Sequence, residues 1–249
     1  MNAAQQNWCK GRTAVITGAS RGIGRALAEA CRRRGMRLVL SARGGGALSS
    51  LATELDPTGA EVLAVPGDVA RADDCRRLVE AAQQRFGHID VLINNAGLAI
   101  PGRLAEIDPK DAETMVTVNF LGTVYCTRFA LPAMIARREG HVIVMDSVAG
   151  LKYSPGGAIY SSTKFALRAY AEALRNEVQS ANVKVTAVYP GMTATTYFDP
   201  QNRNALPPPI PIDQMLTSED VADATVSVLG LPARVSINTV VLRPTIQER

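Results

Sequence analysis

Histidine is scarce in this chain of 249 residues, which contains only His88 and His141. The four cysteines are widely spaced, and none stands in a C-x-x-C pair. Zinc sites and disulfide frameworks need clusters of these residues at short spacings. The sequence therefore predicts no metal site and four reduced thiols.

Long apolar runs are also missing. No stretch of about 18 apolar residues occurs, and the first residues, MNAAQQNWCKG, lack the apolar centre of a signal peptide. The net charge is only +4, and the densest basic run, Arg32–Arg34, precedes Gly35 where a helix is expected to end. No basic stripe with interleaved aromatic residues suggests nucleic-acid binding. These features predict a soluble cytoplasmic protein with no nucleic-acid or membrane partner.

Short apolar runs alternate with amphipathic stretches along most of the chain. The runs show no polar alternation, which is typical of parallel strands covered on both faces. Repeated strand–helix–strand units build one doubly wound sheet with right-handed crossovers. The sequence thus predicts a single α/β domain over 1–249, a Rossmann-like, doubly wound, seven-stranded parallel sheet with helices on both faces. The predicted strands are 13–17, 37–42, 61–69, 89–97, 141–147, 183–191 and 237–242, and the longest helices are 108–138 and 158–181.

The segment 193–217 breaks this pattern. It contains the proline-rich run LPPPIPI, which forbids regular structure. Irregular segments of this length are typically lids or binding loops, although simple packing is an alternative. We expect 193–217 to cover the substrate.

The motif TGASRGIG at 17–24 follows the first strand and allows two interpretations. Gly18, Ser20 and Gly22 fit the G-x-S-x-G elbow of α/β-hydrolases, with Ser20 as nucleophile. That reading needs a histidine at the carboxyl edge of the sheet, but both histidines begin predicted strands at the amino edge. The same glycines suit a loop that brings backbone N–H groups to a nucleotide phosphate. The second interpretation is favoured, and the absence of Gly-Lys-Ser/Thr excludes a P-loop.

No acidic residue ends the second predicted strand, where an NAD site places a carboxylate on the ribose hydroxyls. Ser41, Ala42 and Arg43 stand there instead. A guanidinium favours the 2′-phosphate of NADP, and Arg21 in the glycine loop is a second candidate for it. The alternative is that both arginines are simply solvated. The pattern favours NADP(H).

Tyr160 and Lys164 are four residues apart on a predicted helix and therefore lie on one face. An ammonium group one turn from a phenol favours the phenolate, so such a tyrosine can exchange a proton with a carbonyl or alcohol oxygen. The pair is predicted to be the acid/base centre.

With these motifs, the chain resembles the short-chain dehydrogenase/reductase family over about residues 10–243. The resemblance implies an oxidoreductase that moves hydride between a nicotinamide and a carbonyl or alcohol. It implies four catalytic residues: Asn119, Ser147, Tyr160 and Lys164. Asp146, before the catalytic serine, is interpreted as a structural cap.

The resemblance also implies which residues bind the other groups. The cofactor residues would be Gly18, Ser20, Arg21, Gly22, Ile23, Gly24, Arg43, Asp68, Val69, Asn95, Ala96, Gly97, Tyr160, Lys164, Pro190, Gly191, Thr193 and Thr195. The substrate residues would be Ser147, Tyr153, Tyr160, Tyr189, Met192, Tyr197 and Phe198.

The tail, VSINTVVLRPTIQ, resembles the branch that contains 3-hydroxy-acid and serine dehydrogenases and clavulanate-pathway aldehyde reductases. That likeness favours a small polar carbonyl compound or β-hydroxy acid as substrate. Family members commonly form tetramers or dimers through two long helices and the last strand, which implies a homo-oligomer. An idle NADP-binding sensor of the same fold is the alternative function, but such proteins usually lack a catalytic residue, and all four are present here.

Overall fold

The computed structural model describes residues 7–153, 155–198 and 207–247. In this part of the chain seven parallel strands form one sheet in the order β3-β2-β1-β4-β5-β6-β7. The predicted doubly wound seven-stranded sheet is confirmed. Its strands are β1 Thr13–Thr17, β2 Arg37–Ser41, β3 Val62–Ala64, β4 Val91–Asn94, β5 Gly140–Met145, β6 Val183–Pro190 and β7 Thr239–Leu242.

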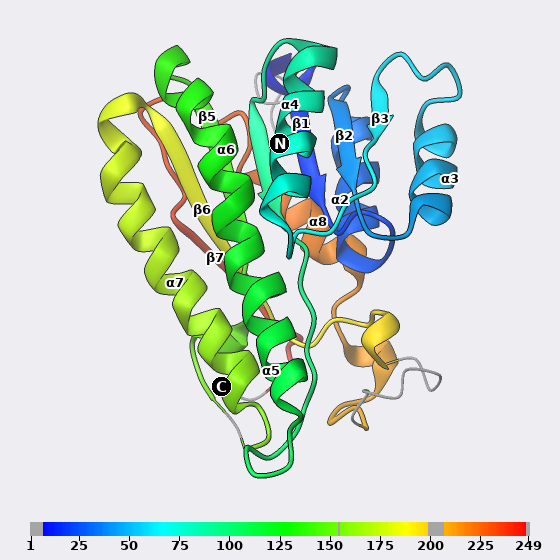
Figure 1. The fold of residues 1–249 in the computed structure, drawn as a ribbon, viewed down its shortest axis with the longest axis vertical. Coiled ribbons are helices and arrows are strands. Elements are labelled where there is room, and N and C mark those ends of the chain that lie inside the picture. The colour runs from blue at the N-terminus through cyan, green and yellow to red at the C-terminus, as the bar shows by residue number, and fades with distance from the viewer. Residues whose placement is uncertain (1–6, 154, 199–206, 248–249) are drawn as a thin grey trace.

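Helices cover both faces of the sheet. Figure 1 shows α4 (Ala72–Phe86), α6 (Gly122–Arg137) and α7 (Ala158–Val178) in front of the strands. The other layer consists of α2 (Gly22–Arg33), α3 (Gly45–Leu55) and α8 (Ser218–Ser227). The strand order reverses between β1 and β4, which is where sheets of this kind bind ligands beyond the carboxyl ends of their strands.

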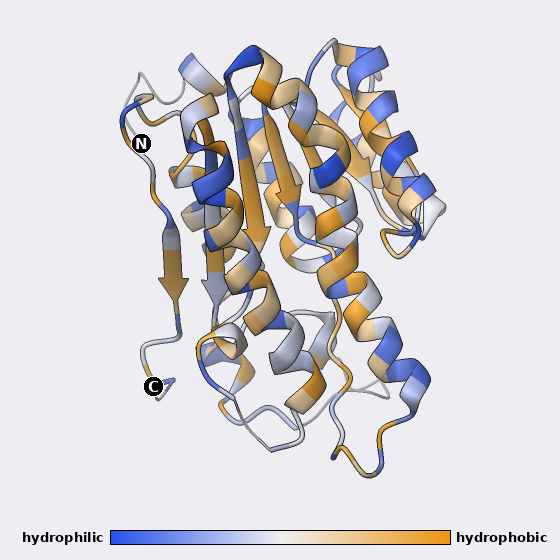
Figure 2. Ribbon diagram, turned by 60° about the vertical axis from the view of Figure 1, so that its left-hand side comes forward, coloured by the Kyte–Doolittle hydropathy of each residue, from blue (hydrophilic) through white to orange (hydrophobic). Residues whose placement is uncertain are grey.

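Alternate residues of each strand enter separate hydrophobic cores. Ile16 and Ile143 pack with α2 and α8, whereas Val15 and Val144 pack with α4, α6 and α7. Figure 2 shows the resulting hydropathy, with hydrophobic strands inside and helices of mixed colour around them. Burial on both faces explains why the strand sequences show no polar alternation.

The predicted helix over 108–138 is not continuous. α5 (Pro109–Met115) leads into a π-helical segment, η1 (Val116–Leu121), before α6 begins. A π segment inserts a wider turn into an α-helix and occurs frequently at functional sites. Asn119 lies in this segment, fully buried. Periodicity alone predicted the helix but not its interruption.

An ion cluster closes the amino edge of the sheet. Asp90, just before β4, accepts hydrogen bonds at Oδ1 from Arg12 (3.0 Å) and Arg137 (2.9 Å). Its Oδ2 accepts from the backbone N–H of Thr13 at 2.8 Å. Glu139 pairs with Arg12 at 2.8 Å on the outer side. Asp90 is 1% exposed, so its charge is buried but completely partnered.

Other features of the described residues bear on the expectations from sequence. All four cysteines are buried and free. The described ranges hold no group of three or more His, Cys, Asp or Glu side chains suited to a metal ion. None of their helices is both long enough and apolar enough to cross a bilayer.

Candidate active site

The glycine loop between β1 and α2 has the geometry that a phosphate loop requires. Gly18 and Gly22 adopt positive φ angles of 66° and 54°, which L-residues with side chains rarely adopt. A Cβ on Gly24 would lie 2.1 Å from the carbonyl oxygen of Gly18, so only glycine allows α2 to approach this turn. The loop thus presents bare backbone at a helix N-terminus, which suits the pyrophosphate of a dinucleotide.

Asn95, after β4, holds this loop in place. Its side-chain amide donates to the carbonyl oxygens of Thr17 (2.9 Å) and Gly18 (3.3 Å). The Thr17 hydroxyl in turn accepts from the backbone N–H groups of Asn95 and Ala96, both at 3.0 Å. The resemblance assigns Asn95 to the cofactor site, and there its amide is engaged with the backbone of the glycine loop. Asn95 therefore shapes the phosphate loop.

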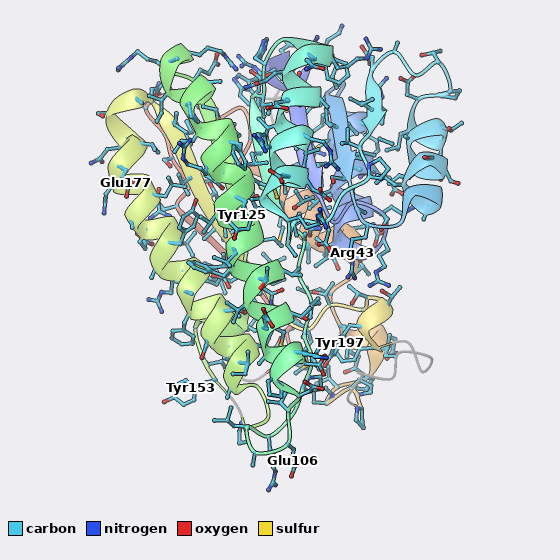
Figure 3. The ribbon with its side chains drawn as sticks, viewed as in Figure 1. Arg43, Glu106, Tyr125, Tyr153, Glu177 and Tyr197 are labelled. Carbon is cyan, nitrogen blue, oxygen red and sulfur yellow. The ribbon has the colours of Figure 1, made fainter. Side chains whose placement is uncertain are left out.

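Arg21 follows β1 in the chain and Arg43 follows β2, and these two strands pair with each other in the sheet. The loop and the end of β2 are joined by a hydrogen bond from the Ala19 N–H to the Ser41 carbonyl, 3.0 Å long. Both arginines are exposed. Figure 3 shows Arg43 at the carboxyl side of the sheet, and its guanidinium is free to meet a ligand there.

Asp68 and Val69 follow β3 at the same edge. The backbone N–H of Asp68 donates to Asp74 at 2.9 Å, and the Asp68 carboxylate accepts from the Ala70 N–H at 3.0 Å. A Cβ on Gly122 would lie 2.9 Å from the Val69 side chain, so this turn packs tightly on the start of α6. The turn of Asp68 and Val69, which the resemblance assigns to the cofactor, is therefore held in place by hydrogen bonds within the turn and to Asp74, and by packing on α6.

Tyr160 and Lys164 lie on the first turns of α7. The Lys164 ammonium is 5.8 Å from the centroid of the Tyr160 ring and donates to the Met145 carbonyl at the end of β5, 3.0 Å away. Lys164 is 5% exposed. This hydrogen bond fixes the buried Lys164 ammonium on the face of α7 that also carries the Tyr160 phenol.

The Asn119 side chain links three elements. Its Oδ1 accepts from the Leu98 N–H at 2.8 Å, and its Nδ2 donates to the Leu98 carbonyl at 2.9 Å and to the Thr163 hydroxyl at 3.2 Å. Thr163 donates to the Tyr160 carbonyl at 2.7 Å. The π segment is thereby bound to the segment after β4, which contains Gly97, and to the turn of α7 that carries the tyrosine.

Ser147 begins a short 3-10 turn, η2 (Val148–Gly150), directly after β5. Its hydroxyl oxygen accepts from the Ala149 N–H at 3.1 Å, which leaves the hydroxyl proton available to a substrate oxygen. Its own N–H donates to Asp146 Oδ1 at 2.9 Å, but the N-cap of the turn is Ser147 itself, so the structural cap expected at Asp146 stands one residue further along the chain. Burial also raises the pKa of the Asp146 carboxyl to about 7, despite the opposing charge of Lys164. The sequence offered a signal for this, an acid at the end of a buried strand beside the predicted serine.

The segment after β6 packs against the glycine loop. The Gly191 N–H donates to the Leu242 carbonyl at 2.7 Å, after Pro190 ends the strand, and the Thr193 hydroxyl donates to the Gly191 carbonyl at 3.0 Å. A Cβ on Gly22 would lie 3.7 Å from Thr195. Residues from both ends of the chain thus meet at one site.

A residue that sequence reasoning missed, Gln247, fixes the start of this segment. Its side-chain Oε1 accepts from the Met192 N–H at 2.9 Å. The same oxygen would lie 2.3 Å from a Cβ on Gly191, so only glycine leaves room for it. The tail resemblance includes this glutamine, but no sequence pattern indicates its partner.

The predicted substrate residues divide into two groups. Met192, Tyr197 and Phe198 belong to the segment that follows β6 at the carboxyl edge, where Figure 3 shows Tyr197, and the ring centroids of Tyr197 and Phe198 are 4.9 Å apart in an edge-to-face contact. Tyr153 is 83% exposed and points into solvent beyond α7 (Figure 3). Tyr189 is 2% exposed and lies in the core under α4, α6 and α7.

Two of these substrate predictions are therefore corrected. Alternation along β6 turns Tyr189 to the same face as Val185 and Ala187, away from any open surface. Tyr153 stands on an exposed loop with no described side chain enclosing it. Residues 199–206 of the predicted substrate loop lie outside the described residues; the remainder is held by reciprocal backbone bonds of Leu216 to Met192 (3.0 Å) and Ala194 (2.8 Å).

The histidines do not reach this edge. His141 lies at the start of β5, buried, with Nε2 2.8 Å from the Thr186 hydroxyl. Since Ser20 stands at the other end of the sheet, the hydrolase interpretation fails on geometry.

Comparison with known proteins places the chain among related sequences. The sequence profile of the family described as "short chain dehydrogenase" matches residues 12–205. An uncharacterized oxidoreductase of Staphylococcus aureus (strain MW2) is 33% identical over 236 residues, which cover 94% of this chain and 97% of the relative.

Solved structures give the same likeness. An alcohol dehydrogenase from Thermococcus sibiricus complexed with 5-hydroxy-NADP superposes with a TM-score of 0.86 at 31% identity, covering 96% of this chain and 99% of that one. A closed form of serine dehydrogenase with NADP+ gives 0.87 at 30% identity, covering 95% and 96%. A short-chain dehydrogenase/reductase from Burkholderia phymatum, in complex with NAD, gives 0.84 at 29% identity, covering 94% and 89%.

Proposed function

The chain belongs to the short-chain dehydrogenase/reductase family of oxidoreductases, and on that premise we propose that it is an NADP(H)-dependent enzyme that interconverts a carbonyl compound and its alcohol. The observation that carries the proposal is the Lys164 ammonium held beside the Tyr160 ring at the end of β5, next to Ser147. The solved structures with NADP or NAD support a nicotinamide dinucleotide as cofactor.

The residues present fit such a cofactor. The glycine loop offers backbone with no Cβ in the way, and Asp68, Val69, Thr193 and Thr195 border the same edge. When bound, the nicotinamide supplies or accepts the hydride. Pro190, Gly191 and the segment after them would form one wall of its pocket.

Tyr160 is the proposed general acid/base. In reduction its hydroxyl proton passes to the carbonyl oxygen of the substrate, and in oxidation the phenolate takes the proton of the alcohol. Lys164 stabilises the phenolate through its charge, because the bond to Met145 holds the ammonium in place. Ser147 would donate its hydroxyl proton to the same substrate oxygen and orient it.

The proposed role of Asn119 is to hold neighbouring segments of the site in place. Both ends of its side-chain amide are already bonded to Leu98 and Thr163. The backbone carbonyl of Asn119, which accepts from the Thr123 hydroxyl at 3.2 Å, is the group that would accept from a water molecule next to Lys164. The alternative of an idle sensor gains no support, since all four catalytic residues stand in the described site.

The test of the reaction is Tyr160→Phe. Loss of the acid/base group is expected to reduce turnover by about 10²–10⁴-fold, while NADPH binding, measured by fluorescence, stays near the native value. Activity is measured as NADPH oxidation with small ketones, aldehydes, β-keto esters and, in reverse, hydroxy acids. Native turnover in the variant would refute the assignment.

NADP(H) preference rests on Arg43 and Arg21. Arg43 stands where an NAD site would carry an acid, and α3 begins with the N-cap Gly44, a small residue that leaves space for a phosphate. Arg43→Ala is expected to weaken NADPH binding by about 10–100-fold, the loss of a charge-assisted contact, with NADH binding unchanged. Arg76→Ala, an exposed arginine on α4, is the control. Equal affinity of the native protein for NADPH and NADH would overturn the preference.

A homo-oligomer, tetramer or dimer, is proposed from the outer face of α7 and η1. An apolar hollow there is lined by Val116, Phe120, Ile159 and Ala166, and Phe165 nearby is 37% exposed. Light scattering on the purified protein measures the assembly. We also propose a cytoplasmic location, supported by four free thiols, and a small polar carbonyl substrate, supported by the likeness to serine dehydrogenase.

A further inference from the structure

Asp146 is a buried carboxyl group that the proposed chemistry does not use. It is 4% exposed and follows β5 on the face covered by α7. Its Oδ1 accepts from the Ser147 N–H, but Oδ2 finds no hydrogen-bond partner among the described residues. A buried polar atom without a partner is uncommon in folded proteins and needs an explanation.

The carboxyl group is packed against the catalytic turn of α7. A Cβ on Gly150 would lie 2.8 Å from Asp146 Oδ1 and 3.1 Å from the Lys164 carbonyl oxygen, so one glycine separates the two residues. The Lys164 ammonium is bonded to Met145, the residue before Asp146. Asp146 thus accepts a hydrogen bond from the Ser147 backbone and lies one glycine away from the lysine turn.

The charged and titratable groups around Asp146 come from two elements. α7 contributes Lys164 and Arg168, whose positive charges favour the carboxylate. β6 contributes the buried phenol of Tyr189, whose pKa rises to about 12 through burial and the nearby Asp146 charge. Desolvation outweighs the two cations and raises the pKa of Asp146 to about 7. Its charge therefore changes within the range in which enzymes of this kind work.

We propose that Asp146 is a positioning residue for the catalytic site, whose carboxylate offsets part of the Lys164 charge and so sets the pH range over which Tyr160 keeps its proton. The proposal rests on the proposed function of Tyr160 and Lys164. With Asp146 ionised, the phenol feels a weaker positive field and stays protonated to higher pH. With the charge removed, the full field of Lys164 favours the phenolate at lower pH.

The first experiment needs no turnover. The ionisation of Tyr160 is followed by ultraviolet difference absorbance in the full chain, with the Tyr160→Phe titration subtracted. Asp146→Asn, which keeps an acceptor for the Ser147 N–H, is expected to lower the midpoint by about 0.5–1 pH unit. The subtraction also removes the signal of Tyr189, whose pKa burial raises to about 12. An unchanged midpoint would overturn the proposal.

Asp90→Asn is the matched control, since it removes a buried carboxylate at the opposite edge of the same sheet. It is expected to leave the Tyr160 midpoint unchanged. Should Asp146→Asn not fold, Asp146→Ala removes the same charge and is read in the same way. In a Lys164→Met background, Asp146→Asn is expected to lower the Tyr160 midpoint by a similar amount, because the fields of the two charges add; loss of the shift there would show that Asp146 acts only by holding the lysine in place and would overturn the electrostatic proposal.

The second experiment is the pH profile of turnover. In Asp146→Asn the alkaline limb of carbonyl reduction and the acid limb of alcohol oxidation are both expected to move to lower pH by the same amount. A drop in rate with both limbs unmoved indicates a purely structural residue and overturns the proposal. If Tyr160→Phe retains native activity but the Tyr160 midpoint still shifts in Asp146→Asn, the proposed function fails while the electrostatic coupling stands.

Discussion

Asp90 and Asp146 are both buried carboxyl groups, one at the amino edge of the sheet and one at the carboxyl edge. Two guanidinium groups and a backbone N–H surround Asp90. Asp146 has a single backbone N–H and one oxygen with no described partner. A fully partnered charge fixes the strands, whereas a poorly partnered one has a shifted pKa and remains able to titrate. The buried charge at the amino edge therefore contributes to stability, whereas the buried carboxyl group at the carboxyl edge lies beside the proposed catalytic residues.

The largest expected effect comes from Asp90→Asn. The variant leaves Arg12 and Arg137 with the outer Glu139 as their remaining shared counter-charge, and breaking a buried ion pair costs about 3–5 kcal/mol. The lower end is expected, since both guanidinium groups are partly exposed. The free energy of unfolding is measured in urea. A loss below about 1 kcal/mol would mean that the cluster contributes no more than surface ion pairs do.

The second prediction concerns the pH dependence of stability. The Asp146 pKa is about 7 in the folded protein and about 4 in the unfolded chain, so its contribution to stability is complete below pH 4 and is lost as the pH rises to 7. The Asp146→Asn variant has no carboxyl group at this position, so it does not lose this stability as the pH rises. Relative to the native protein, the variant should gain about 2–3 kcal/mol between pH 5 and pH 8.

That comparison is made by urea unfolding at both pH values. Parallel slopes of stability against pH in the two proteins would show that Asp146 ionises normally in the fold. His141, at the other end of β5, also affects the pH dependence of stability below pH 6.5. Burial lowers its pKa to about 3, so stability is lost as the pH falls from 6.5. His141 is present in both proteins, so its contribution cancels when the two are compared at the same pH.

The smallest expected effect is that of Gln247→Ala. One neutral hydrogen bond holds Met192 at the start of the cofactor wall, worth about 1 kcal/mol. The Kd for NADPH is expected to rise about fivefold. Gln247→Glu keeps an acceptor and should restore most of the affinity. If Ala and Glu behave alike, the contact does not hold the wall.

Much of the fold could be predicted from the sequence because local rules and tertiary structure agree there. Unbroken apolar runs gave the seven strands, and the placement of Tyr160, Lys164 and Ser147 followed from strand order. Asn95 was assigned to the cofactor from the resemblance alone, and Gln247 was not assigned, since the partners of both side chains are backbone atoms of distant segments. Tyr189 was misplaced because a one-residue step along β6 decides which face a side chain enters.

Substrate residues were the least predictable part of the site. Tyr153 lies on a loop, and Tyr197 and Phe198 lie on a single 3-10 turn, Thr196–Phe198; segments this short carry no periodicity. In the described part of 193–217, Leu216 forms backbone hydrogen bonds with Met192 and Ala194, and the sequence gives no sign of this distant pairing. Sequence patterns therefore predict the strands and helices of the scaffold, but not the conformation of the segments that carry the substrate residues.

The π segment Val116–Leu121 acts as a phase shift between two helices. Each residue of an α-helix advances the chain by about 100°, so a wider turn rotates everything before it relative to everything after it. Deleting one residue here would restore an uninterrupted helix and swing α5 about a third of a turn around its axis. Such a deletion would spare the sheet and α6, yet it would carry Asn119 away from Leu98 and Thr163. The length of this helix, counted residue by residue, is therefore part of the active site.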